Sequence, residues 1–290
     1  MVIVFNPTAG NRRVSRLWRV LDILAASGVR CEVARTAGPG EARLLAARAA
    51  ASGERVVVAA GGDGTIAEVA AGLIGSDSAL GVIPLGTANV LAREYALPFP
   101  PRAVAAALAF ARTRPLWPGL AETDGGTERV FVQMLGLGFD AAVVRAVGPR
   151  LKRLTGRAAY AIETLATLFR YDFRPIRLRI DGIETEAASA IVTKGRLYGG
   201  PWCLAPEARS DAPGFSVVLF DRAGPRAALC AGIALPLGRL GRMGGVRRLR
   251  AREVEVIGVD PIPAQADGDP AGKMPRRVRD AAAGIPLVVG

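Results

Sequence analysis

The residues best suited to chemistry lie in a glycine-rich turn, Gly61-Gly62-Asp63-Gly64-Thr65, between two apolar segments. Val56 to Val58 before the turn predict a buried strand, and the apolar residues after it recur about every 3.6 residues, which predicts a helix. Glycines allow backbone N–H groups to approach a ligand, and the N-terminus of the next helix favours an anion. Thr65 adds a hydroxyl donor, and Asp63 adds a carboxylate suited to a metal or a ribose. The turn therefore predicts a phosphate site.

Two other interpretations of this turn have to be weighed. A tight strand-to-helix turn favours glycine and aspartate without any ligand, so its context must decide. Gly62 to Ala67 also fits the dinucleotide fingerprint G-x-G-x-x-A, which requires an acidic residue about 20 residues further on. The segment there, Ala79 to Thr87, has no carboxylate. A hydride-transferring enzyme is therefore the least favoured hypothesis.

Composition limits the chemistry further. The chain has 290 residues, is 50% hydrophobic and contains no histidine. Every Ser-His-Asp or Cys-His mechanism is therefore excluded, and a general base must be a carboxylate, a lysine or a tyrosine. The formal net charge is +12, which suits an anionic membrane or a phosphorylated substrate, whereas 6% aromatic residues and no recognisable module argue against nucleic acid.

The three cysteines, Cys31, Cys203 and Cys230, are too few and too scattered for a disulfide framework. No apolar run reaches the roughly 18 residues of a membrane span, and the first residues do not form a secretory signal. We therefore expect a cytoplasmic protein without a transmembrane segment and without a nucleic-acid partner.

The pattern of elements changes near residue 118. Before it, apolar runs at 2–5, 29–34, 55–60 and 80–83 alternate with helical patterns at 14–25 and 40–52, as in a parallel α/β sheet. After it, β-like runs dominate, with a helix expected over 156–171. The runs lie at 129–135, 176–180, 187–193, 215–220, 253–259 and 286–289. We predict an α/β domain over 1–118 and a mainly β domain over 119–290.

Three polar loops follow predicted strands of the first domain. They are Asn6-Pro7-Thr8-Ala9-Gly10, the turn 61–65, and Pro84-Leu85-Gly86-Thr87-Ala88-Asn89. The carboxyl ends of parallel strands share one edge of the sheet, where ligands bind. Three glycine-containing loops at one edge strengthen the prediction of a phosphate site.

These motifs carry a resemblance to a known family. NPTAG, GGDGTIAEV, PLGTANVLA, FVQMLGLGFDA and Asp267-Gly268-Asp269 occur in the order found in the diacylglycerol kinase catalytic family, which includes bacterial soluble lipid kinases and the sphingosine and ceramide kinases. The resemblance covers almost the whole chain. It implies a Rossmann-like α/β nucleotide-binding domain followed by a β-sandwich domain, with the active site in the cleft between them.

The resemblance also implies which residues bind ATP and Mg²⁺. Asp63 is the implied Mg²⁺ ligand, and Asp211 corresponds to a structural metal site that some relatives carry in the second domain. Matching positions assign ATP to Asn6, Pro7, Thr8, Ala9, Gly10, Thr36, Gly61, Gly62, Asp63, Gly64, Thr65, Glu68, Gly86, Thr87 and Asn89.

Phosphoryl transfer to a hydroxyl needs a group that accepts its proton, and without histidine a carboxylate is the natural candidate. The family motif at this position is DGE, whose Glu is the proposed acceptor. Here the matching residue is Asp269, one methylene shorter, with Asp267 before it. We predict Asp269 as the base and Asp267 and Asp63 as further catalytic residues. A plain hairpin turn is the alternative for this segment.

The sequence departs from the family at two acidic positions, where Val90 and Trp117 stand. The Asn-Gly pair of the helix after GGDGT is Ala71-Gly72, and the aspartate of the second-domain metal loop falls nearer Ala212 than Asp211. These departures motivate one alternative, a non-catalytic nucleotide- or lipid-binding protein. A second alternative is a NAD kinase-like enzyme, which shares GGDGT.

We predict an ATP-dependent, Mg²⁺-requiring lipid kinase of phospholipid metabolism, which phosphorylates a hydroxyl of diacylglycerol or of a related sphingoid or ceramide-like lipid. Its expected partner is a lipid at the membrane surface, reached by peripheral contact at the inner face of the membrane. The basic segment Arg239 to Arg252 is a candidate membrane-facing patch, with a solvated loop as the alternative. The prediction leaves a homodimer open.

Overall fold

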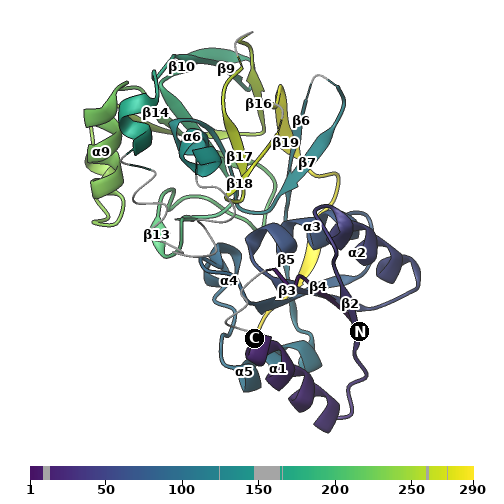
Figure 1. The fold of residues 1–290 in the computed structure, drawn as a ribbon. Coiled ribbons are helices and arrows are strands. Elements are labelled where there is room, and N and C mark those ends of the chain that lie inside the picture. Colours follow the sequence, from purple (N-terminus) through teal and green to yellow (C-terminus); the bar gives the residue numbers. More distant parts are fainter. Residues whose placement is uncertain (9–13, 124, 147–163, 165, 259–260, 273) are drawn as a thin grey trace. The chain divides into compact units, whose positions relative to one another are not determined.

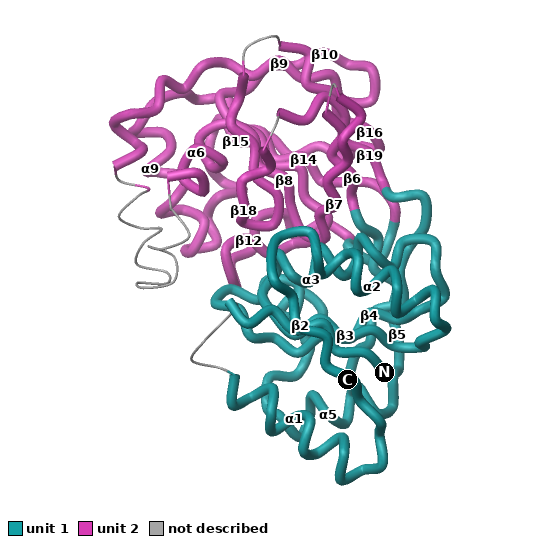
Figure 2. The backbone as a smooth tube through the Cα atoms, turned by 45° about the vertical axis from the view of Figure 1, so that its right-hand side comes forward, with its two compact units in different colours: residues 1–118, 210–212, 281–290 teal, residues 119–209, 213–280 magenta. Residues whose placement is uncertain are grey.

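The computed structural model describes residues 1–290 except 9–13, 124, 147–163, 165, 259–260 and 273. The chain divides into two units (Figures 1 and 2). Unit 1 consists of Met1–Pro118, Ser210–Ala212 and Ala281–Gly290, and unit 2 consists of Gly119–Arg209 and Pro213–Asp280. The main segments of the two units meet after residue 118. The last ten residues lie in unit 1 because their strand pairs with strands of that unit.

Unit 1 contains one six-stranded sheet in the order β2-β1-β3-β4-β20-β5. The first four of its strands in the chain are parallel, β20 runs parallel to β4, and β5 is antiparallel to β20. The strands are β1 (Val2–Phe5), β2 (Glu32–Arg35), β3 (Val56–Gly61), β4 (Ala79–Pro84), β5 (Thr113–Leu116) and β20 (Ile285–Val288).

Helices cover both faces of this sheet. They are α1 (Val14–Ala26), α2 (Glu41–Ala51), α3 (Asp63–Leu73), α4 (Val90–Glu94) and α5 (Pro101–Phe110). Leu17 of α1 and Leu108 of α5 share one core with Ile3 and Val58 of the sheet. Strand side chains alternate between the faces, and α2 and α3 pack together against the other face.

Unit 2 is a sandwich of two six-stranded sheets, ordered β10-β9-β16-β19-β6-β7 and β15-β14-β11-β8-β17-β18. The first contains β6 (Gly119–Glu122), β7 (Glu128–Phe131), β9 (Ile176–Ile180), β10 (Ile183–Ala187), β16 (Glu253–Val256) and β19 (Arg277–Asp280). The second contains β8 (Met134–Gly138), β11 (Ser189–Thr193), β14 (Phe215–Phe220), β15 (Val246–Ala251), β17 (Ala264–Ala266) and β18 (Asp269–Pro270).

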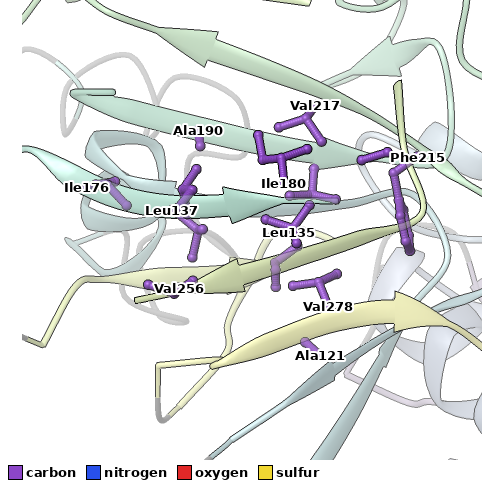
Figure 3. Packing of buried hydrophobic residues seen from close by; sticks show 14 of the residues in the cluster. Ala121, Leu135, Leu137, Ile176, Ile180, Ala190, Phe215, Val217, Val256 and Val278 are labelled. Carbon is purple, nitrogen blue, oxygen red and sulfur yellow. The ribbon is translucent and has the colours of Figure 1, made fainter. Parts of the chain in front are cut away.

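The two sheets bury a common core of aliphatic and aromatic side chains. Leu135 and Val217 from one sheet meet Ile180 and Val278 from the other (Figure 3). The rings of Phe131 and Phe215 stack with their centroids 6.0 Å apart. Unit 2 also contains α6 (Phe139–Ala146), α9 (Pro225–Ala234), the 3-10 helix η2 (Leu240–Arg242) and the small hairpin of β12 (Leu197–Tyr198) and β13 (Trp202–Cys203). The predicted fold class, an α/β domain followed by a β-sandwich, is confirmed.

Two expectations differ from the structure. The run 129–135 was expected as one strand, but β7 and β8 belong to different sheets and are separated by a corner at Val132 and Gln133. The basic segment 239–252 is not a plain loop, since it contains η2 and the edge strand β15. Most of the helix expected over 156–171 lies outside the described residues. Within the described residues, every helix is too short or too polar to cross a membrane.

Candidate functional site

The polar loops of unit 1 meet at the carboxyl edge of its parallel strands. Asn6 follows β1, Thr36 follows β2, and β3 ends at Gly61. The Asn6 Nδ2 group donates to Thr65 Oγ1 over 3.0 Å, and the backbone N–H of Gly86 donates to the carbonyl oxygen of Gly61 over 3.2 Å. The structure therefore brings together the loops that the sequence analysis assigned to one phosphate site.

The Asn6 side chain organises the first of these loops. Its Oδ1 atom accepts hydrogen bonds from the backbone N–H and the hydroxyl of Thr8, over 2.9 Å and 2.8 Å. Because Thr65 Oγ1 accepts from Asn6, the Thr65 hydroxyl proton is directed toward a different acceptor. Pro7 stands between Asn6 and Thr8 in this loop, whereas Ala9 and Gly10 fall outside the described residues.

Glycines are required here by close backbone approach. A Cβ atom on Gly86 would lie 2.6 Å from Gly62 Cα and 2.8 Å from Asn89 Oδ1, and one on Gly61 would lie 2.5 Å from Thr65 Cβ. None of Gly61, Gly62, Gly64 and Gly86 has a positive φ, so the conformational freedom of glycine is not what these positions use. The two loops pack so closely that a side chain at Gly61 or Gly86 would collide with them. We call Gly61–Thr65 together with Gly86 the glycine cradle.

Asp63 and Asn89 meet beside this cradle. Asp63 is the first residue of α3, and its Oδ1 atom accepts from the backbone N–H of Leu91 over 3.3 Å. Asn89 precedes α4 in a left-handed conformation and is 2% exposed. Its Nδ2 group donates to the carbonyl oxygen of Gly86, whereas its buried Oδ1 atom has no hydrogen-bond partner among the described residues. A buried acceptor in this state fits a bound water or ligand donor.

The remaining predicted nucleotide contacts are Thr36, Thr87 and Glu68. Thr36 is buried at the end of β2, and Thr87 is exposed in the loop after β4. The Glu68 carboxylate instead accepts from the backbone N–H groups of Gly40 and Ala42, over 3.0 Å and 3.2 Å. Glu68 therefore fixes the N-terminus of α2.

In unit 2, the Asp267-Gly268-Asp269 segment lies at the hairpin turn between β17 and β18, which the sequence analysis gave as the alternative to a catalytic role. Asp267 has a φ of 50°. Its carboxylate accepts from three backbone N–H groups, at 2.7 Å from Val132 and 2.9 Å from both Gln133 and Met134. Asp267 therefore holds the corner between β7 and β8, and this is a positioning role. Asp269 begins β18, is half-buried and pairs with Ala266.

A buried polar network that the sequence analysis did not single out supports this turn. Gln265 Oε1 accepts from the backbone N–H of Gly268, and its Nε2 group donates to Asp140 Oδ2, both over 2.8 Å. Tyr198 donates to the other Asp140 oxygen. Burial raises the pKa of Asp140, and the two hydrogen bonds oppose that shift. Asp140 lies within the quoted FVQMLGLGFDA motif, but nothing in the spacing indicated its partners.

Gln133 is a second residue that the sequence analysis missed. It is 1% exposed, and its backbone is tied to the turn through Asp267. Neither its Nε2 nor its Oε1 atom has a hydrogen-bond partner among the described residues. Two buried polar atoms without hydrogen bonds lower the free energy of unfolding, so their presence in one side chain suggests a ligand or an ordered water.

The surroundings of Asp211 do not favour a metal. The Arg114 Nη2 atom lies 3.6 Å from Asp211 Oδ2, and no cluster of three or more Asp, Glu, Cys or His side chains exists among the described residues. In unit 2, the fully buried Lys194 donates to the carbonyl oxygen of Gly214 over 2.8 Å and to Asp280 Oδ1 over 2.6 Å. Burial lowers the pKa of Lys194, and Asp280 opposes that shift.

The two departures from the family pattern are explained by local packing. Val90 is buried in the first turn of α4. The Trp117 indole N–H donates to the carbonyl oxygen of Ala281 over 3.2 Å, and a Cβ on Gly284 would lie 3.0 Å from the same ring. Trp117 therefore anchors the segment that leads into β20.

Comparison with known families matches both parts of the chain. Residues 1–119 match the "Diacylglycerol kinase catalytic domain" family, and residues 133–289 match the "YegS C-terminal NAD kinase beta sandwich-like domain" family. The two matches follow the division into an α/β unit and a sandwich unit.

Individual relatives agree with these matches. A "Probable lipid kinase YegS-like" of Xanthomonas campestris pv. campestris (strain 8004) is 31% identical over 284 residues, which cover 92% of this chain and 89% of that protein. A "Diacylglycerol kinase" of Mycobacterium tuberculosis (strain ATCC 25618 / H37Rv) is 36% identical over 172 residues, 58% of this chain and 55% of that protein.

The fold is also shared with a solved structure. The crystal structure of a diacylglycerol kinase from Bacillus anthracis str. Sterne covers 100% of this chain and 96% of its own chain, with a TM-score of 0.71 at 17% identity. At that identity the likeness concerns the fold alone. The two family matches and the relative that spans nearly the whole chain together show that the chain belongs to the diacylglycerol kinase catalytic family, a family of ATP-dependent lipid kinases.

Proposed function

We propose that this enzyme transfers the γ-phosphate of ATP to a hydroxyl of diacylglycerol or of a related lipid. The observation that carries the proposal is the glycine cradle at the N-terminus of α3. The backbone N–H groups in the first turn of α3 and the positive end of that helix suit a phosphate chain, and the absence of a side chain at Gly86 lets the two loops pack side by side. Thr65 and Thr87 add hydroxyl donors at the same sheet edge.

The residues beside the cradle fit a Mg²⁺ ion. Asp63 supplies a carboxylate oxygen, the ligand type that Mg²⁺ prefers, and the buried Asn89 Oδ1 acceptor suits a water held by the ion. When bound, Mg²⁺ supplies positive charge that offsets the charge of the phosphates. The Asp211 carboxylate faces Arg114, so we assign no metal to it.

Asp269 is the proposed proton acceptor. The lipid hydroxyl oxygen attacks the γ-phosphorus, its bond to phosphorus forms while the bond to the ADP oxygen breaks, and the hydroxyl proton passes to the Asp269 carboxylate. Asp267 acts as a positioning residue, because its carboxylate is engaged by three backbone N–H groups. The Asp140–Gln265 network fixes the other side of the same turn through Gly268.

Gln133 is the proposed contact for the polar part of the lipid. Its carboxamide can both donate to and accept from a glycerol hydroxyl or an ester or amide carbonyl, and it has no partner among the described residues. This proposal places the acceptor lipid beside the turn that carries Asp269. The lipid is membrane-derived, and the enzyme acts on it from the cytoplasmic side by peripheral contact.

The test measures transfer of radiolabelled γ-phosphate from ATP·Mg²⁺ into extractable lipid, with diacylglycerol, monoacylglycerol, sphingosine and ceramide offered in mixed micelles. We expect Asp269→Asn to reduce transfer by about a hundredfold or more with ATP binding retained. Asp63→Ala should reduce transfer and also the dependence on Mg²⁺. The matched control is Asp77→Asn, an exposed aspartate in the loop before β4.

The outcomes separate the alternatives. Label in one lipid class, lost in Asp269→Asn and kept in Asp77→Asn, supports the proposal and names the acceptor. Label in NAD instead of lipid would support a NAD kinase-like enzyme. ATP binding without transfer to any acceptor would support a non-catalytic binding protein, for which the replacement of two acidic residues by Val90 and Trp117 would be the reason.

A further inference from the structure

Helix α9 (Pro225–Ala234) exposes its large apolar side chains. Leu229, Ile233 and, just beyond the helix, Leu237 are 45%, 54% and 61% exposed. Their spacing of four residues places them along one side of the helix. The side that faces unit 2 carries alanines instead, of which Ala234 is buried and Ala227 and Ala231 are half-buried. A surface helix of a globular protein normally has the opposite arrangement.

The composition around α9 is equally unusual. Apart from Arg226, residues 223–238 contain no charged residue, and residues 222–252 contain no acidic residue. Figure 1 shows α9 at the margin of unit 2. An exposed helix with a single charged residue marks a surface that is covered in the working protein.

Exposed arginines lie at both ends of this apolar face. Arg226 is in the first turn of α9, and the backbone N–H of Arg239 donates to the carbonyl oxygen of Ala234 over 2.8 Å, which folds the chain back onto the end of the helix. Arg242 follows in η2. None of these three is paired with a carboxylate of the described residues, in contrast to Arg247, which is paired with Asp221.

We propose that Leu229, Ile233 and Leu237, with Arg226, Arg239 and Arg242, form the surface by which the enzyme docks on an anionic lipid bilayer. We call this set the α9 surface. Its apolar side chains enter the boundary between headgroups and acyl chains, and the arginines bind the lipid phosphates. The long arginine side chains reach the headgroup layer while their apolar stems follow the helix.

The charge of the α9 surface favours a bilayer over a second copy of the chain. In a symmetric dimer through α9, the arginines of the two copies would approach each other without any acidic residue in 222–252 to balance them. Three apolar side chains on one short helix also fall well short of the roughly 800 Å² per partner of a stable interface.

This inference rests on the proposed function, because a kinase with a lipid acceptor must reach the membrane. Vesicle binding nevertheless requires neither ATP nor catalysis. The two can therefore fail separately, and binding is measured first, on the full chain without nucleotide.

The first experiment is flotation with vesicles of phosphatidylcholine alone or mixed with phosphatidylglycerol. We expect Leu229→Ser/Ile233→Ser to weaken partitioning to the mixed vesicles by about tenfold or more. Arg226→Gln/Arg239→Gln should weaken it about tenfold on mixed vesicles and leave it unchanged on pure phosphatidylcholine. The control is Ile183→Ser, a 74% exposed isoleucine at the start of β10, which should bind like the parent chain. Equal binding of parent and Leu229→Ser/Ile233→Ser would overturn the proposal.

The second experiment uses Cys230, an exposed cysteine within α9. With Cys31 and Cys203 replaced by serine, an environment-sensitive dye on Cys230 should shift to the blue on mixed vesicles and be quenched by brominated lipid. An unchanged spectrum on vesicle-bound protein would contradict docking through α9.

Two further readouts keep the interpretation unambiguous. Phosphorylation of a short-chain, micelle-free diacylglycerol should be unchanged in Leu229→Ser/Ile233→Ser, whereas phosphorylation of the vesicle-embedded lipid should fall with binding. Sedimentation without lipid should give the same mass for both chains. A lower mass for the variant would show that α9 binds a second copy, and the proposal would then be wrong.

Discussion

At the residue scale, the turn of unit 2 that carries Asp269, the proposed proton acceptor, is held by two neighbouring polar side chains. Asp267 is engaged by three backbone N–H groups, and Gln265 links the turn to Asp140. These contacts fix the backbone that leads into Asp269. A carboxylate one methylene shorter than glutamate has less reach, so a rigid turn matters more for its placement.

Gln133 provides a test in which stability and activity change in opposite directions. Gln133→Met keeps the length of the side chain and removes two buried polar atoms without partners, so we expect it to raise the free energy of unfolding by about 1–3 kcal/mol. The same change should lower kcat/KM for the lipid by about tenfold and leave KM for ATP unchanged. Urea unfolding and the kinase assay measure the two effects.

The matched control is Gln265→Met, because Gln265 is equally buried but both of its polar atoms are hydrogen-bonded. We expect this change to lower the free energy of unfolding by about 1–3 kcal/mol. If both variants were destabilised alike, the unpaired state of Gln133 would be refuted.

Tyr95 gives a prediction for alkaline pH. Its hydroxyl donates to the carbonyl oxygen of Pro115 over 2.7 Å, and burial is the main cause that raises its pKa from 10.0 to about 12. Below pH 10 the phenol is protonated in both the folded and unfolded states. Between pH 10 and 12 the unfolded state loses the proton first, so stability should fall there, by about 2–3 kcal/mol at pH 12.

Tyr95→Phe isolates this contribution. The variant should be about 1 kcal/mol less stable at pH 8, because it lacks the hydrogen bond, and it should lack the additional loss above pH 10. Urea unfolding at pH 8 and pH 11 measures both effects. An equal loss of stability in the two proteins between these pH values would contradict the assignment.

At the element scale, the close packing of α2 against α3 depends on Gly72. A Cβ there would lie 2.4 Å from the carbonyl oxygen of Arg43 and 2.9 Å from Ala46 Cβ. We expect Gly72→Ala to lower the free energy of unfolding by about 1–3 kcal/mol, although alanine is the better helix former by about 1 kcal/mol. Thermal and urea unfolding measure the change.

Gly232, in the middle of α9, is the matched control because a Cβ there meets nothing within 4 Å. Gly232→Ala should leave stability unchanged or raise it by up to about 1 kcal/mol. Opposite signs for the two substitutions would show that contact between helices, rather than helix propensity, decides the effect at Gly72.

The sequence predicted elements well where a local pattern determines them. The helix expected over 14–25 is α1, and the strands expected at 176–180 and 215–220 are β9 and β14. The prediction from sequence was wrong where a contact between residues far apart in the sequence determines the local structure. The run 129–135 divides at Val132 and Gln133 because Asp267, far away in the sequence, binds the backbone there.

The same division applies to the candidate site. The glycine cradle could be predicted because its residues are contiguous in two short motifs. The unpaired amide of Gln133 and the Tyr198–Asp140–Gln265 network could not, since their partners come from separate strands and helices. The apolar face of α9 could not be recognised either, because side-chain periodicity alone does not show which face meets the protein.

At the scale of the whole molecule, this lipid kinase completes its first unit with the last strand of its chain. Ile285, Leu287 and Val288 of β20 are at most 3% exposed and lie between β4 and β5. Removal of 281–290 should therefore destabilise unit 1 by about 5 kcal/mol, which is enough to unfold an average domain. Circular dichroism and solubility of residues 1–280, compared with those of the full chain, measure this effect.

A direct fusion supplies the control for that truncation. The backbone N–H of Ala281 donates to the carbonyl oxygen of Pro118 over 2.9 Å, so residue 118 can be joined to residue 281 through a short linker. We expect the fusion of 1–118 with 281–290 to melt cooperatively where 1–118 alone does not. If 1–118 folded equally well, the strand would be dispensable for unit 1.

The position of β20 also sets the order of events during protein synthesis. Residues 119–280 are translated after β4 and before β20, which at about 5–20 residues per second takes on the order of 10–30 s. Throughout that time β4 lacks its neighbour while the nascent chain is still attached to the ribosome. The sheet of unit 1 therefore closes only after β20 has been synthesised, so its first four strands wait for a partner that is translated after the whole of unit 2.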